Sequence, residues 1–142
     1  MAFEDYVKAQ KLGLKAHRMA VSEGKWPYLP VLDEIAAQSQ IDYELNLGVS
    51  EIPLAQVVGT DTAGRTQAFG PNFMPLLDPD SEFASKWVSL CDSQMEEGIR
   101  EAVKVYEYMN RYYVREGNKR VSVLKYVNNP TILAEVIRKV PK

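Results

Sequence analysis

The segment Glu116-Gly117-Asn118-Lys119-Arg120 places two neighbouring cations just after a glycine, where a strand-like run gives way to a helix-like run. The first backbone N–H groups of a helix carry partial positive charge, so cations there are unfavourable unless an anion joins them. Glycine lacks the Cβ that would block a ligand, and the free N–H groups of the helix start are suited to anions. The segment therefore predicts a phosphate or carboxylate site.

Each residue of this segment has an expected role. Asn118 would cap the helix or bond a ligand oxygen, Lys119 would supply a mobile charge, and Arg120 would supply a planar fork for two oxygens. A structural interpretation stays open beside it. The two cations are then solvated, or they pair with Glu116 and another acidic residue across the fold.

A second candidate contact lies in the long segment 59–80, which contains three glycines and three prolines. Connections of this length are uncommon in compact domains unless they bind something or are disordered. The apolar residues of the segment argue against disorder: Phe69, Phe73, Met74, Leu76 and Leu77. Arg65 is its only basic residue, and we expect it to contact the ligand.

The composition restricts the class of protein. The 142 residues are 46% hydrophobic and 25% charged, which is typical of one folded globular domain. The net charge is −2, whereas autonomous DNA-binding domains are usually basic. No apolar run is long enough to span a bilayer, and the first residues lack the apolar part of a signal peptide. We therefore expect a cytoplasmic protein with no membrane partner.

Cysteine and histidine are too scarce for several kinds of site. Cys91 is the only cysteine, so an internal disulfide is excluded, and at helical spacing it fits a core position. His17 is the only histidine, and we expect it on a helix at a surface or half-buried position. A structural zinc site and a Cys-His or Ser-His nucleophile pair are disfavoured for the same reason.

The hydrophobic pattern predicts an α+β domain with a mixed sheet and flanking helices. Helices are expected over residues 3–23, 31–38, about 81–97 and 118–127, and the third should be capped by Asp80 or Ser81. Residues 43–49 alternate as a half-buried strand that continues to Gly59, with a bulge near 48–50. A hairpin turns at Met109 and Asn110, and a last strand covers 132–140. In the first helix, Phe3, Val7, Leu14 and Val21 fall near one stripe, with Tyr6 beside them.

Three segments together resemble the ParB/sulfiredoxin-like superfamily. The stretch "EGNKRVSVLKY" is similar to its conserved box, in which a glycine, one variable residue and a basic pair open a helix after a hairpin. "EIPLAQVV" is similar to the first strand of ParB N-terminal domains, and "EGIREAVKVYE" to the stretch before the hairpin. The whole chain also resembles ParB-like N-terminal domains of larger Firmicutes-type proteins. The resemblance divides the chain into a helical extension, 1–42, and a ParB/sulfiredoxin-like domain, 43–142.

This resemblance implies a nucleotide-binding function. The box binds CTP in partition proteins and ATP in sulfiredoxin, so Gly117, Asn118, Lys119 and Arg120 would hold phosphate oxygens here. Glu116 would help to bind a metal-nucleotide with Mg²⁺ or orient the cations. Arg65 is similar to the arginine that ParB-type domains bring to the same pocket.

The sequence also departs from the family. Ala102 stands where a proline is usual, and segment 59–80 is longer than in partition proteins. Asn118 occupies the place of the sulfiredoxin cysteine, so sulfiredoxin chemistry is excluded. No helix-turn-helix follows the box, so nucleic acid would be bound only through a further domain.

Three functions remain open from the sequence. The first is a nucleotide-binding regulatory domain with Arg65 closing over the phosphates. The second is a nucleotide or phosphodiester hydrolase, with Glu116, Asp61 and Asp78 as candidate acids. The third is an interaction domain without a ligand, in which the hairpin tyrosines form a homodimer surface: Tyr106, Tyr108, Tyr112 and Tyr113.

Overall fold

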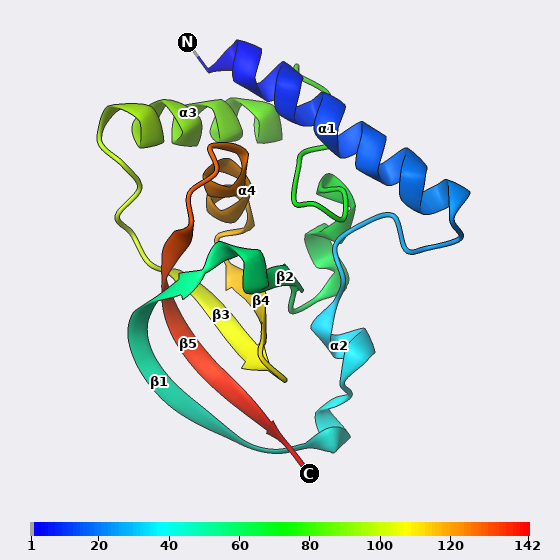
Figure 1. The fold of residues 1–142 in the computed structure, drawn as a ribbon, viewed down its shortest axis with the longest axis vertical. Helices are drawn as coiled ribbons and strands as arrows, with labels where there is room; N and C mark the ends of the chain where they lie inside the picture. Colours follow the sequence, from blue (N-terminus) through cyan, green and yellow to red (C-terminus); the bar gives the residue numbers. More distant parts are fainter. Residues whose placement is uncertain (1) are drawn as a thin grey trace.

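The computed structural model describes residues 2–142, and the side chain of Arg65 lies outside the described part. Four α-helices and five strands follow one another in mixed order (Figure 1). They are α1 Phe3–Ser22, α2 Leu32–Ile35, β1 Ile41–Pro53, β2 Val57–Thr60, α3 Glu82–Glu96, β3 Val103–Tyr108, β4 Arg111–Glu116, α4 Asn118–Tyr126 and β5 Thr131–Pro141. Short 3₁₀ helices lie at η1 Gln38–Gln40, η2 Leu54–Gln56 and η3 Ala63–Ala68. The predicted α+β class is confirmed.

The five strands form one mixed sheet in the order β1-β5-β3-β4-β2. Strand β1 is antiparallel to β5, and β3 is antiparallel to β4. The other two pairs, β3 with β5 and β2 with β4, are parallel. The sheet lies in the lower half of Figure 1, with α1, α3 and α4 above it.

Three apolar clusters hold these elements together. The largest joins the sheet to α4 and to Phe69 and Phe73 of the long connection. A second joins α1, α3 and α4 around Trp87, whose indole N–H donates to the hydroxyl of Ser122 at 2.9 Å. The third packs α2 against Tyr113 and its neighbours. The long connection is therefore part of the core, as its apolar residues predict.

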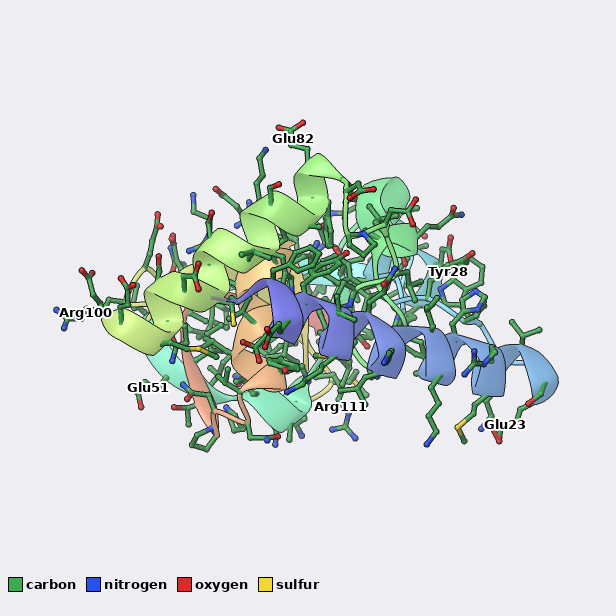
Figure 2. All side chains as sticks on the ribbon, turned by 90° about the horizontal axis from the view of Figure 1, so that it is seen from above. Glu23, Tyr28, Glu51, Glu82, Arg100 and Arg111 are labelled. Carbon is green, nitrogen blue, oxygen red and sulfur yellow. The ribbon has the colours of Figure 1, made fainter. Side chains whose placement is uncertain are left out.

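Helix α1 has nearly the expected bounds but buries a different face from the expected stripe. Its buried residues are Tyr6, Ala9, Gly13 and Ala20, whereas Phe3, Leu14 and Val21 are exposed. The reason is close backbone contact: a Cβ on Gly13 would lie 2.3 Å from the carbonyl oxygen of Pro75. Figure 2 shows the end of α1 at Glu23 projecting past the other helices.

Strand β1 was expected to be half buried, and this is wrong. It is one continuous strand, and residues 42–51 are all exposed. Its alternating pattern is real, but β1 is an edge strand whose far part has no covering layer. The expected bulge is present, since the register with β5 shifts between Asn46 and Gly48.

Several local predictions are confirmed. The β3–β4 hairpin turns at Met109 and Asn110, which both have positive φ, as a tight two-residue hairpin turn requires. The hydroxyl oxygen of Ser81 accepts the N–H of Ala84 at 3.1 Å and so caps α3. Cys91 is fully buried in the second cluster. The second helix is shorter than predicted, at four residues.

Within residues 2–142, no helix combines the length and the apolar character that crossing a bilayer requires.

Candidate functional site

The start of α4 forms one wall of a large cleft with a volume of about 1330 Å³. Residues from the end of β4 to the first turn of α4 line this wall. The cleft is closed by η3 on one side and by the exposed face of α3 on another. Two stretches that the sequence singled out separately, 116–120 and the connection after β2, therefore meet at one cleft.

Gly117 gives the wall its shape. It is the N-cap of α4 with φ of +114°, a conformation that other residues rarely adopt. A Cβ at this position would also lie 2.6 Å from Cγ1 of Val103. Among the described residues, no side chain caps the start of α4. The first turn of α4 therefore lines the cleft without a side-chain cap, an arrangement suited to an anion.

Asn118 ties the start of α4 to strand β2. Its Nδ2 donates to Oγ1 of Thr60 at 3.4 Å, and the Thr60 hydroxyl donates to the carbonyl of Val114 at 3.1 Å. The other side-chain atom of this amide, Oδ1 of Asn118, is buried and has no hydrogen-bond partner. Among the described side chains, which exclude that of Arg65, it is the one buried oxygen or nitrogen without a partner. Asn118 does not cap its own helix through its side chain, so one of its two expected roles is not used.

The two neighbouring cations point to different surroundings. The ammonium of Lys119 lies over the ring of Phe83, 5.4 Å from its centroid, and both residues line the cleft. The guanidinium of Arg120 donates to the carbonyls of Glu101 and Ala102 at 3.3 and 3.2 Å. Its side chain is 14% exposed, and the Glu101 carboxylate lies 3.7 Å away. Arg120 therefore fastens the turn that leads into β3.

Glu116 and Arg65 occupy different places at this site. The carboxylate of Glu116 pairs with Lys104 at 3.6 Å, on a surface where both side chains are well exposed. Arg65 belongs to η3, whose residues Ala63 and Gly64 line the cleft. The side chain of Arg65 lies outside the described residues, so its expected contact stays a prediction.

Sequence reasoning did not find three residues of the cleft. Phe83 is half buried and lines the cleft. Lys86 comes one turn later on α3 and pairs with Glu82 at 3.4 Å. Arg115 lies with its guanidinium 4.7 Å from the ring centroid of Tyr106. Only the i, i+3 spacing of Phe83 and Lys86 on one predicted helix face could have indicated part of this set.

The candidate acids of a hydrolase do not gather in the cleft. Of Glu116, Asp61 and Asp78, only Glu116 lines it. Burial raises the pKa of Asp61, with Asp33 adding to the rise and the backbone N–H of Thr62 opposing it. The described residues contain no group of three acidic, histidine or cysteine side chains suited to a metal ion.

Comparison with known proteins adds a structural likeness. No protein-family model and no curated protein matches the chain. The crystal structure of sulfiredoxin from Arabidopsis thaliana is similar to it, with a TM-score of 0.44 and 20% sequence identity. The match covers 62% of this chain and 82% of that chain. A likeness of this size assigns neither a family nor a function.

Proposed function

We propose that the cleft binds a nucleotide or another phosphate-bearing ligand, with the phosphates at the start of α4. The observation that carries the proposal is the uncapped helix start at Gly117, which forms a wall of a large cleft beside Lys119. The resemblance of residues 116–126 to the ParB/sulfiredoxin-like box favours a nucleotide, CTP or ATP, over other anions.

In this proposal Lys119 and Arg120 have different roles, whereas the sequence suggested that both would contact phosphate oxygens. In the proposal, the backbone N–H groups of the first turn and the ammonium of Lys119 contact phosphate oxygens. Arg120 supports them by holding the turn before β3 and by adding positive charge close to the site. The described residues offer no acidic cluster, so Mg²⁺ would enter with the nucleotide and be held by its phosphates.

The expected affinity is modest. Hydrogen bonds to charged groups contribute roughly 1.5–3 kcal/mol each, and the helix terminus adds about 0.3–1 kcal/mol per negative charge. Two or three contacts give about 4–7 kcal/mol before ordering costs, which corresponds to dissociation constants between roughly micromolar and millimolar.

Thermal unfolding with added ligand tests the proposal. CTP or ATP with Mg²⁺ at millimolar concentration should raise the melting temperature of the whole chain, because a ligand that binds only the folded state stabilises it. Lys119→Ala should remove most of the shift. Lys15→Ala is the matched control, since Lys15 is exposed on α1 and does not line the cleft. An unchanged melting temperature with every nucleotide would overturn the proposal.

The two other functions find less support. Since Asp61 and Asp78 do not line the cleft, no specific observation favours a hydrolase. The hairpin tyrosines pack within the chain, with Tyr113 only 5% exposed and Tyr106 and Tyr108 beside the third cluster. A homodimer stays a prediction that light scattering can test. On β1, Tyr43, Leu45, Leu47 and Val49 are exposed apolar residues as well.

A further inference from the structure

The cleft has an apolar and aromatic side as well as a cationic one. Its lining includes Phe83, Leu77 and Leu90, which are far in the sequence from the cationic segment 116–120. Pockets for small organic ligands are usually about 300–1,000 Å³, and this cleft, at about 1330 Å³, is at least as large. Phosphate groups alone would leave the apolar side unfilled.

Phe83 is the residue of that side with the most defined position. Its ring is half buried and meets Phe69 edge to face, with centroids 5.3 Å apart and an interplanar angle of 72°. The ammonium of Lys119 lies over the ring. Phe69 therefore holds the ring in place, while a face of the ring is turned towards the first turn of α4.

We propose that Phe83 stacks against a flat aromatic group of the ligand, so that the cleft selects aromatic phosphate esters over simple phosphates. The inference rests on the proposed function and adds an aromatic group to the phosphate-bearing ligand. Lys119 lies 5.4 Å from the ring centroid, so one side chain spans the distance between the stacked ring and the phosphate end.

Lys119 connects the two halves of the ligand site. Its ammonium lies over the ring of Phe83, and such a cation–π contact contributes about 0.5–2 kcal/mol. A phosphate close to the helix start attracts the ammonium more strongly. Its movement towards the phosphate exposes the ring face, so phosphate binding and stacking assist each other.

The test compares ATP with inorganic tripolyphosphate, which has the same phosphate chain but no ring. Calorimetry on the whole chain should show that ATP binds more tightly than tripolyphosphate by roughly 5- to 150-fold, the usual range for stacking on one aromatic side chain. Phe83→Leu should remove this preference, measured as the ratio of the dissociation constants of the two ligands. Phe83→Trp should keep it.

Phe83→Trp also provides an optical readout. Stacking should quench the fluorescence of the new tryptophan when ATP is added and not when tripolyphosphate is added, with the wild-type signal of Trp26 and Trp87 subtracted. If Phe83→Leu loses tripolyphosphate binding as well, the substitution has damaged the fold. The quenching of Phe83→Trp by ATP then decides whether the ligand stacks on this position.

The two proposals fail in different ways. If neither ATP nor tripolyphosphate binds the wild-type chain, the proposed function fails. If tripolyphosphate binds, but Phe83→Leu keeps the full preference for ATP or Phe83→Trp is not quenched, only the stacking inference is overturned.

Discussion

Gly117 is required for the stability of the fold, and this requirement can be measured without any ligand. Gly117→Ala combines a strained backbone conformation with a contact to Val103, so we expect a loss of about 2–4 kcal/mol in the free energy of unfolding. Gly64→Ala is the matched control, because nothing lies within 4 Å of the added Cβ and Gly64 also lines the cleft. Urea denaturation measures both, and equal stability of the two variants would contradict the requirement.

Arg120 is expected to affect stability more than Lys119 does. Arg120→Ala removes the donor to the carbonyls of Glu101 and Ala102, and such charged hydrogen bonds are worth roughly 1.5–3 kcal/mol. The loss should appear as a lower denaturation midpoint in the absence of any ligand. Arg100→Ala, a neighbouring arginine on an exposed turn, should change the midpoint little. If the ligand-free Arg120→Ala variant is as stable as wild type, the hydrogen bonds from Arg120 to Glu101 and Ala102 do not stabilise the fold.

The partners of Arg120 could not be predicted from the sequence alone. The carbonyls that it contacts lie 18 and 19 positions earlier in the chain, and no local pattern marks them. The glycine and the helix start, by contrast, depend on residues next to one another in the sequence, and these were predicted correctly.

At the scale of elements, the Ser81 cap fixes the start of α3 and therefore the position of Phe83. Ser81→Ala removes the hydroxyl that accepts the N–H of Ala84, so we expect a loss of about 0.5–2 kcal/mol. Ser85→Ala, one turn later on an exposed position of the same helix, serves as the control. Chemical denaturation distinguishes the two, and a larger loss for Ser85→Ala would contradict the role of the cap.

Sequence patterns predicted which elements exist better than which faces they bury. The hairpin, α4 and β5 depend on local turn residues and periodicity, and all three were found close to the expected bounds. The face of α1 was missed because small residues, Ala9 and Gly13, make the closest contacts while larger apolar residues stay exposed. The burial of β1 was missed because an alternating pattern does not reveal whether a second layer covers it.

At the scale of the whole molecule, Tyr6 and Tyr126 should make the fold sensitive to alkaline pH. Burial raises the pKa of both Tyr6 and Tyr126 from 10.0 to about 12, with Asp78 adding to it for Tyr6 and Asp5 for Tyr126. A raised pKa in the folded state means that the contribution to stability is complete below pH 10 and is lost as the pH rises towards 12.

Spectrophotometric titration and alkaline unfolding test this sensitivity. Tyr6, Tyr126 and also Tyr113, whose pKa is raised by burial, should ionise late in the folded chain and together with the other tyrosines after unfolding. The double variant Tyr6→Phe with Tyr126→Phe should lose less stability between pH 10 and 12 than the wild type. Tyr43→Phe, at an exposed position on β1, should behave as wild type. Identical pH profiles for the double variant and wild type would contradict the assignment.

The pairing of β1 with β5 has a consequence for how the chain folds during synthesis. Strand β1 is hydrogen-bonded only to β5, and the paired residues are about 80 to 100 positions apart. The ribosome therefore produces β1 long before its neighbour exists, and meanwhile the backbone N–H and C=O groups of β1 stay available to other nascent chains. The sheet closes only when residues 131–141 leave the exit tunnel, since β5 also joins β1 to β3.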